Sequence, residues 1–415
     1  MNNKMIVQHK MLLPLFLITC AGLFFTTCEN GDINGNISVN YQSELQKMLD
    51  EKWSDYVADK PNYPGGYGLL VIKDENEYYA ATGELKNLGD QVHFRAASTT
   101  KTFTGAAILL LHQRKLLNIN HLIIENIPGT TKPYIPDIDT FNIPYKEQIT
   151  IKLLLQHRAG VFDIMNTVIP DTVVAPYAGY LYAEYILQQD QDHTFTHEEC
   201  INVVAKHQLY YFAPNKAFHY SDLGSRILTY IIERVTGQSY AEFLEENLLI
   251  PNNLMNTSFP SQGTDHSIPA PIAKGYVFDE GIVYDVTEQN VSVHVGEGNV
   301  IITPDDLTNW IDLLLRGKAG IDKKYVEFMM MDCLPTLESH QFYGLHCVLT
   351  PSLGYGHNGG TLGYWTVSRH NPEWDLTFTV FSNVWDWQAI IVDFMTQPLE
   401  LYDIGSRVGD IFSSD

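Results

Sequence analysis

The sequence predicts an α/β (α+β) fold in which one β-sheet is built from both ends of the chain and helices fill the middle. Strand-like alternation of apolar and polar residues occurs near both ends, whereas about 111–304 shows mostly helical patterns and long loops. We therefore expect an α/β part formed by about 41–110 and 305–400. The segment between them is then a helical insertion, and the whole unit spans 41–400.

The first elements have clear boundaries in the sequence. A helix is predicted at 41–57, because its apolar residues recur on one face. After a Pro/Gly break, two strand-like runs at 67–73 and 77–82 predict a hairpin. A long amphipathic stretch, 98–116, predicts the next helix.

The later elements follow from capping and stop signals. Helices are predicted at about 149–157, 223–235, 239–249, 303–315 and 387–399. Strands are predicted at 343–350, 362–370 and 376–383. Gly237 and Pro251 end two of these helices, and Thr303 followed by Pro304 begins another.

Composition limits the class of protein. The chain has 415 residues, of which 45% are apolar and 18% charged, so it can bury a sizeable core. The formal net charge of -23 repels phosphate backbones, so we expect no nucleic-acid partner. The same charge disfavours contact with anionic lipid, except through a covalent anchor.

The N-terminal residues predict such an anchor. Lys4 and Lys10 precede the apolar run of Met11 to Phe25, which is too short for a transmembrane helix and typical of an export signal. Cys28 follows this run, and the segment resembles a bacterial lipoprotein cleavage site. Cys20 is a competing site, and ordinary cleavage that gives a soluble product is the alternative.

The segment 1–28 is therefore predicted to be a lipoprotein signal peptide that ends at Cys28, the lipidated residue. Residues 29–40 are rich in Asn and Gly and predict a flexible tether. The expected location is the periplasm or outer surface, with the membrane contacted through the lipid anchor only.

Three cysteines remain after Cys28, namely Cys200, Cys333 and Cys347. They are too few for a disulfide framework, and their spacing fits no zinc motif. The sequence leaves open whether two of them form a disulfide. We expect no metal and no cofactor.

Ser98-Thr99-Thr100-Lys101 opens the predicted helix 98–116. Positions three apart share a helix face, so Ser98 and Lys101 stand side by side at the N-terminus. A neighbouring amine can take the proton of a serine hydroxyl, and the helix N-terminus favours a developing oxyanion. The simpler interpretation is that Ser98 caps the helix and Lys101 is a solvated charge.

Two further motifs could serve the same site. Tyr220-Ser221-Asp222 directly precedes the predicted helix 223–235. The simplest interpretation is that Ser221 or Asp222 caps this helix. The functional interpretation is that the phenol of Tyr220 shuttles protons. His357-Asn358-Gly359-Gly360 lies between two strand patterns. It predicts either a hairpin turn or an edge strand whose glycines let a substrate backbone approach closely.

In this order and spacing, the three motifs resemble those of the serine β-lactamase-like hydrolases. The similar branch holds class C β-lactamases, serine DD-carboxypeptidases, D-aminopeptidases and related esterases. The segments 149–160, 221–240, 251–259 and 296–307 also resemble stretches of that family. The resemblance covers roughly 41–400. It implies a β-lactamase/DD-peptidase-like fold with an antiparallel sheet flanked by helices, plus an all-helical subdomain.

The resemblance also implies a role for each motif residue. Ser98 is the acylated nucleophile, and Lys101 accepts its proton together with Tyr220, which also protonates the leaving group. His357 stands where many relatives have Lys, and it would steer substrate. The oxyanion hole would be the N–H groups of Ser98 and Gly360. Asp222, Asn358 and Gly359 complete the implied set as substrate-binding residues.

Two departures from the family pattern bear on substrate. Asp222 stands where many relatives have Asn, and a carboxylate cannot donate a hydrogen bond to a substrate carbonyl. His357 is neutral more often than Lys, which weakens its attraction for a substrate carboxylate.

We therefore expect an exported serine hydrolase, a D-amino-acid peptidase, carboxypeptidase or esterase, whose partner is a small-molecule or peptide substrate. The alternatives are a true β-lactamase and an inactive envelope protein that binds cell-wall peptides.

Overall fold

The computed structural model describes residues 40–331, 333–336, 341–393 and 395–413. The predictions for the signal peptide, Cys28, Cys20 and nearly all of the tether lie outside the described residues. Within those ranges no helix is long and apolar enough to cross a membrane.

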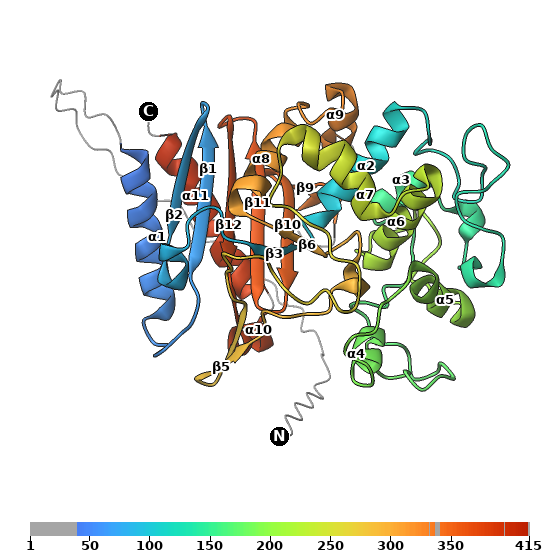
Figure 1. Cartoon of the computed structure of the whole chain (residues 1–415), viewed down its shortest axis with the longest axis horizontal. Coiled ribbons are helices and arrows are strands. Elements are labelled where there is room, and N and C mark those ends of the chain that lie inside the picture. The colour runs from blue at the N-terminus through green and yellow to red at the C-terminus, as the bar shows by residue number, and fades with distance from the viewer. Residues whose placement is uncertain (1–39, 332, 337–340, 394, 414–415) are drawn as a thin grey trace. The chain divides into compact units, whose positions relative to one another are not determined.

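The main sheet of the described residues joins both ends of the chain. Its strands are β1 (Tyr67–Lys73), β2 (Asn76–Ala81), β7 (Leu334–Pro335), β8 (Phe342–Tyr343), β9 (Val348–Thr350), β10 (Gly354–Thr361), β11 (Tyr364–Asn371) and β12 (Leu376–Ser382). They lie in the order β2-β1-β12-β11-β10-β9-β8-β7, and every neighbouring pair is antiparallel (Figure 1). The pairing of β1 with β12 confirms the predicted sheet.

Helices of the described residues cover both faces of this sheet or lie beside it. They are α1 (Tyr41–Val57), α2 (Thr100–Gln113), α3 (Ile151–Leu155), α4 (Tyr182–Leu187), α5 (His197–His207), α6 (Asp222–Thr236), α7 (Tyr240–Leu244), α8 (Pro304–Leu315), α9 (Lys323–Met331), α10 (Trp387–Val392) and α11 (Thr396–Phe412). On one face α1 and α11 form a core with β1, β11 and β12 that includes Leu49, Val380 and Ile404. On the other face α8 packs, and its Trp310 stacks on Phe103 of α2. Both faces being covered, every residue of β11 and β12 is buried.

The middle of the chain is less uniform than predicted. The helices α3 to α7 gather beside α2, away from α1 and β2 (Figure 1). The same segment also contributes the short strands β4 (Tyr276–Asp279), β5 (Ile282–Asp285) and β6 (Val300–Ile302). β6 pairs with β3 (Phe94–Ala97), and β4 with β13 (Val384–Asp386). Strands of three or four residues are too short for alternation to show in the sequence.

Most predicted helix signals act as expected. Thr150, Ser221 and Thr303 each accept a hydrogen bond from the backbone N–H three residues later, at the start of α3, α6 and α8. Gly237 ends α6 with a φ of 74° in the left-handed region. The predicted helix 239–249 keeps its α geometry only through Leu244 and continues as a wider π turn.

Two predicted elements are divided in the structure. The strand predicted at 343–350 is β8 and β9, because the N–H of Gly344 donates to the carbonyl of Cys347 at 2.8 Å and forms a turn between them. The helix predicted at 387–399 ends at Val392 as α10, and α11 begins at Thr396 and runs on to Phe412. Pro398 is tolerated in the first turn of α11, where its missing N–H has no helical acceptor.

Candidate active site

Ser98 lies in the turn that joins β3 to α2. The chain leaves β3 through Ala97, whose φ of 48° is in the left-handed region, so the turn is tight. The helix begins at Thr100, two residues after the predicted start. Ser98 is half-buried, while Ala97 and Lys101 are buried, so the serine is the part of this motif that a substrate can reach.

The Lys101 side chain is fully buried and reaches Ser98. Its Nζ donates to Ser98 Oγ at 3.2 Å and to the carbonyl oxygen of Glu297 at 2.9 Å. It also lies 2.6 Å from Asp222 Oδ1. Burial alone lowers the pKa of Lys101, but the Asp222 and Glu297 carboxylates outweigh burial and raise it.

Tyr220 precedes α6 and lies against both Ser98 and Lys101. Its phenol interacts with the Ser98 side chain, which lowers the pKa of Tyr220 in part. Lys101 Nζ lies 4.7 Å from the centre of the Tyr220 ring. Burial, reinforced by the Asp222 charge, raises the pKa of Tyr220 well above its usual range, so the resting phenol is neutral. Ser98, Lys101 and Tyr220 are thus brought together as the sequence predicted.

The carboxylate of Asp222 contacts Lys101 and is not left available to a substrate. One carboxylate oxygen contacts Lys101, and the other accepts a hydrogen bond from Asn166 Nδ2 at 2.7 Å. Burial raises the pKa of this carboxyl, but Lys101 outweighs burial and the net pKa is lowered. The predicted substrate contact is therefore not what the geometry shows, because both oxygens of this buried carboxylate already have partners.

Glu297 is a member of the site that the sequence did not assign. Besides its carbonyl contact, its Oε2 lies 3.5 Å from Lys101 Nζ. The residue stood within the Gly296-Glu297-Gly298 segment of the family resemblance, but a single acid between glycines gave no sign of this contact. We call Lys101, Asp222 and Glu297 the ionic cluster.

A second group, which we call the neutral cluster, also lies near Tyr220 and consists of His157, Tyr343 and His357. The Tyr343 hydroxyl lies 2.8 Å from His357 Nε2 and 3.1 Å from His157 Nε2. The ring of His157 lies 4.3 Å from that of Tyr220. His357 is thus near the site as predicted, but it is buried and held by Tyr343.

The hydrogen bonds of the neutral cluster can run in one direction only. The N–H of Ser221 donates to His157 Nδ1 at 3.1 Å, so the proton of His157 is on Nε2 and is donated to Tyr343. Tyr343 then donates to His357 Nε2, and His357 Nδ1–H donates to the Asn358 carbonyl at 2.6 Å. Burial, together with the Lys101 charge, lowers the pKa of His357 to about 3.

The glycines of the third motif allow β10 to lie against β3. A Cβ on Gly359 would come within 2.1 Å of the Ala96 carbonyl oxygen, so only glycine fits there. The hairpin-turn alternative for this motif is wrong, because the motif lies within β10. Gly360 follows at the uncovered edge of that strand and is exposed, and its role as an oxyanion donor beside Ser98 remains a prediction.

Asn358 is not placed where its predicted role required it. Its amide oxygen accepts from Arg369 Nη2 of β11 at 2.5 Å, and its amide nitrogen donates to the Tyr402 hydroxyl of α11. Successive side chains on a strand point to opposite faces, so Asn358 points toward α11 while His357 faces the site. The structure therefore does not bring Asn358 to Ser98.

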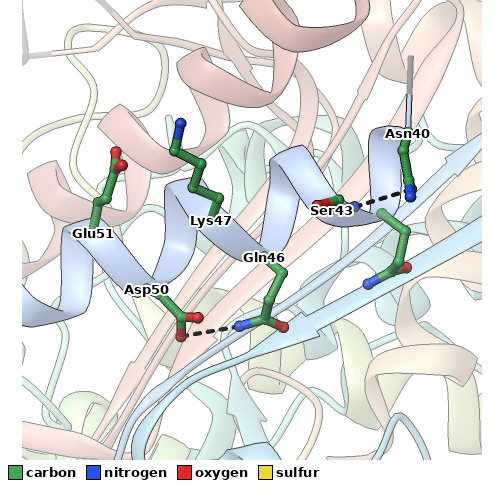
Figure 2. A pocket seen from close by; sticks show the side chains of 7 residues that line it. Asn40, Ser43, Gln46, Lys47, Asp50 and Glu51 are labelled. Carbon is green, nitrogen blue, oxygen red and sulfur yellow. Dashed lines mark hydrogen bonds between the residues drawn. The ribbon is translucent and has the colours of Figure 1, made fainter. Parts of the chain in front are cut away.

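A hollow on α1 is a separate feature. It is lined by polar residues, among which Gln46 donates to Asp50 at 3.0 Å and Asn40 accepts from the backbone of Ser43 (Figure 2). None of the motif residues lines it. The cysteines are equally uninvolved, since Cys200, Cys333 and Cys347 form no disulfide within the described chain.

The fold and the arrangement of Ser98, Lys101 and Tyr220 agree with the family that the comparisons identify. The Beta-lactamase family profile matches residues 53–393, which is most of the chain. The protein belongs to this family.

Relatives and solved structures agree with that placement. Penicillin-binding protein 4* of Bacillus subtilis (strain 168) is 27% identical over 319 residues, which are 74% of this chain and 64% of that protein. Protein flp of Staphylococcus aureus (strain NCTC 8325 / PS 47) is 26% identical over 49% of this chain and 36% of its own length. The chain thus spans less than two thirds of these curated relatives.

Among solved structures, the D-amino acid amidase of Ochrobactrum anthropi SV3 complexed with D-phenylalanine superposes with a TM-score of 0.71 at 21% identity. That match covers 91% of this chain and 100% of the amidase. A D-stereospecific amidohydrolase from Streptomyces sp. gives 0.67 at 21% identity, over 83% of this chain and 95% of that chain. At this identity the likeness shows the shared fold.

Proposed function

We propose that the protein is an exported serine hydrolase that forms an acyl-enzyme on Ser98 and acts on D-amino-acid peptides or amides, or on small esters. The observation that carries this proposal is the 3.2 Å contact between Lys101 Nζ and Ser98 Oγ, with the Tyr220 ring 4.7 Å from the same Nζ. The amidases among its structural neighbours and the penicillin-binding proteins among its relatives support the substrate class.

In the proposed reaction Ser98 Oγ attacks the substrate carbonyl as its proton passes to Lys101, acting with Tyr220. The N–H groups of Ser98 and Gly360 receive the oxyanion, and one such donor is worth about 3 kcal/mol of barrier. Tyr220 protonates the leaving amine or alcohol. Water then attacks the ester on Ser98, with the same groups acting in reverse.

The neutral cluster supports a preference among substrates. His357 occupies the place of a cation in many relatives, yet both of its nitrogens are engaged and it stays neutral. The nearby Arg369 is fully buried and donates to Asn358 and Ser368. A carboxylate on the leaving group therefore gains little from these residues. We propose that amides and esters with neutral leaving groups react faster than penicillins or D-Ala-D-Ala peptides.

The export part of the proposal rests on the sequence. The basic residues and apolar run before Cys28 support a lipid anchor at Cys28, with Cys20 as the competing site. A Cys28→Ala variant that still partitions into the membrane fraction would contradict the assignment to Cys28.

The proposal is tested by mixing purified protein with p-nitrophenyl acetate, D-phenylalanine p-nitroanilide, an N-acyl-D-Ala-D-Ala peptide and a penicillin. Product release and intact mass are followed together. The Ser98→Ala variant is run alongside, and Ser43→Ala, at an exposed serine on α1, is the matched control. We expect turnover of the ester or anilide that depends on Ser98 and not on Ser43.

The other outcomes separate the alternatives. Consumption of the penicillin without a lasting adduct indicates a β-lactamase, and a lasting adduct on Ser98 indicates a wall peptidase. Binding of the wall peptide that survives Ser98→Ala, with no turnover of any probe, indicates a binding protein and contradicts the proposal.

A further inference from the structure

A histidine–carboxylate pair lies behind Lys101 and has no part in the reaction proposed above. Glu297 Oε1 lies 2.5 Å from His294 Nδ1, and Glu297 Oε2 lies 3.5 Å from Lys101 Nζ. Since Lys101 also contacts Ser98, these four residues form a continuous line of polar contacts that begins at the nucleophile.

This line leads from buried groups to solvent. The side chain of Lys101 is 0% exposed and that of Glu297 2%, whereas that of His294 is 32% exposed. His294 can therefore exchange protons with water, while Lys101 and Glu297 exchange only with their neighbours.

The backbone around Gly296 fixes the position of the pair. Gly296 has a φ of 82°, and a Cβ there would come within 1.7 Å of Thr229 Oγ1. Its carbonyl accepts from Thr104 Oγ1 at 2.6 Å, and its N–H donates to Asn299 Oδ1 at 3.0 Å. Helices α2 and α6 thus both hold this turn, which places the Glu297 carboxylate against the lysine.

Lys101 needs a proton acceptor because it rests as an ammonium ion, with hydrogen bonds to Ser98 Oγ and to the carbonyl oxygen and Oε2 of Glu297, and with Asp222 as an ion-pair partner. An ammonium ion cannot take the proton of Ser98. Asp222 is the poorer acceptor, since Lys101 outweighs burial and lowers its pKa. Burial, with the Asp222 charge, instead raises the pKa of Glu297, which makes its carboxylate the better base.

We propose that Glu297 accepts the proton that Lys101 must release before it can deprotonate Ser98, and that the charge of His294 controls this transfer. An N–H bond of Lys101 breaks as an O–H bond forms on Glu297 Oε2. The Oγ–H bond of Ser98 then breaks as Lys101 regains a proton, so no proton is gained or lost. Glu297 and His294 act through Lys101 and are positioning residues, and the inference rests on the proposed function.

The charge of His294 determines whether Glu297 can accept the proton of Lys101. A protonated His294 stabilises the Glu297 carboxylate and keeps the proton on Lys101, whereas a neutral His294 lets Glu297 accept it. Burial lowers the pKa of His294, but Glu297 outweighs burial and raises it above its usual range. Other titratable groups whose charge interacts with the pair include Lys101, Asp163, Cys200, Tyr220, Asp222 and Tyr240. We therefore expect acylation to accelerate as pH rises through the His294 transition.

The kinetic test measures kcat/KM for the best substrate from pH 5.5 to 9 in wild type, His294→Gln and Glu297→Gln. The expected wild-type rise between pH 6 and pH 8 is about tenfold, as for one ionisation. His294→Gln is neutral at every pH, so its rise falls to about twofold and its rate at pH 6 exceeds that of wild type. Glu297→Gln cannot accept a proton and loses about tenfold at pH 8.

The matched control is His193→Gln, which removes another histidine paired with a glutamate, Glu199, at nearly the same exposure. It should leave the profile unchanged. A His294→Gln profile identical to wild type overturns the inference, as does an equal loss at every pH, which indicates a purely structural role.

A second readout keeps the inference separate from the proposed function. The titration of His294 is followed by NMR in the Ser98→Ala protein, with and without Glu297→Gln and Lys101→Met. We expect the pKa of His294 to fall when Glu297 is neutralised and to rise when Lys101 is removed. If wild type hydrolyses nothing, the proposed function fails and this titration alone decides the coupling. A His294 titration unmoved by both substitutions overturns the inference even in an active enzyme.

Discussion

The ionic and neutral clusters both adjoin Tyr220 and bury polar groups in opposite ways. In the ionic cluster, Lys101 keeps its charge by contacting Asp222, Glu297 and Ser98. In the neutral cluster, each group donates one hydrogen bond to the next, and no charge is needed. Burial is nearly complete in both, so the difference comes from the partners and not from the solvent.

Because of this difference, the two clusters respond differently to protonation. A buried charge without partners costs several kcal/mol, so the ionic cluster is stable only while its charges are matched. The ionic cluster can therefore respond to a single proton. The neutral cluster cannot do so near neutral pH, because burial and neighbouring positive charges keep His357 and His157 unprotonated. The neutral cluster therefore packs against Tyr220 without attracting anions.

The largest expected effect comes from removing the centre of the ionic cluster. Lys101→Met should lower kcat/KM by about 10³-fold, because Ser98 loses its proton acceptor. It should also lower the free energy of unfolding by about 3–5 kcal/mol, since Asp222 is left as an unpaired buried charge. The measurements are steady-state kinetics and urea unfolding.

Two variants sharpen this prediction. Lys101→Met combined with Asp222→Asn should recover much of the stability and none of the activity. Lys146→Met removes another buried lysine, one paired with the exposed Asp137, and should leave activity intact. Retention of a tenth or more of the activity by Lys101→Met would show that Tyr220 deprotonates Ser98 without the lysine.

A smaller effect is expected from acid, and it comes from buried histidines, two of which belong to the neutral cluster. Burial lowers the pKa of His357 to about 3 and of His370 to about 4, and it lowers those of His157 and His346 well below the usual range. The unfolded chain binds these protons below about pH 6.5 and the folded chain does not, so stability is lost as pH falls from 6.5 toward 4. Each histidine contributes at most about 1.4 kcal/mol per pH unit.

Urea unfolding at pH 7, 6 and 5 measures this slope. His346→Gln should reduce this slope by up to about 1.4 kcal/mol per pH unit, the most that one histidine contributes. The reason is that glutamine cannot take up the proton in the unfolded state. His193→Gln, at a histidine that is about a third exposed, should change it less. An unchanged slope in His346→Gln would mean that His346 takes no part in the acid sensitivity, which the other buried histidines would then have to explain.

The sequence was informative where local signals decide the structure. Caps at Thr150 and Thr303, and the three-residue spacing of Ser98 and Lys101, act over one helical turn and were visible in the sequence. The pairing of β1 with β12 followed from alternation near both ends of the chain.

The contacts that define the two clusters were not predictable in this way. Glu297 meets Lys101 across 196 positions of sequence, and Tyr343 meets His157 across 186. No local pattern marks either residue. Asn358 was misplaced because its strand register, and not its neighbour His357, decides which face its side chain occupies.

The smallest expected effect comes from opening the neutral cluster with Tyr343→Phe. The change removes the hydroxyl that donates to His357 Nε2, so that nitrogen becomes free to take a proton and the pKa of His357 should rise from about 3. A protonated His357 can then attract a leaving-group carboxylate. The variant should gain about threefold in kcat/KM for an N-acyl-D-Ala-D-Ala peptide at pH 5.5, as for one weak ion pair, with no gain for a neutral ester. An equal change for both substrates would show that Tyr343 only supports the shape of the site. The neutral state of His357 would then not determine which substrate is preferred.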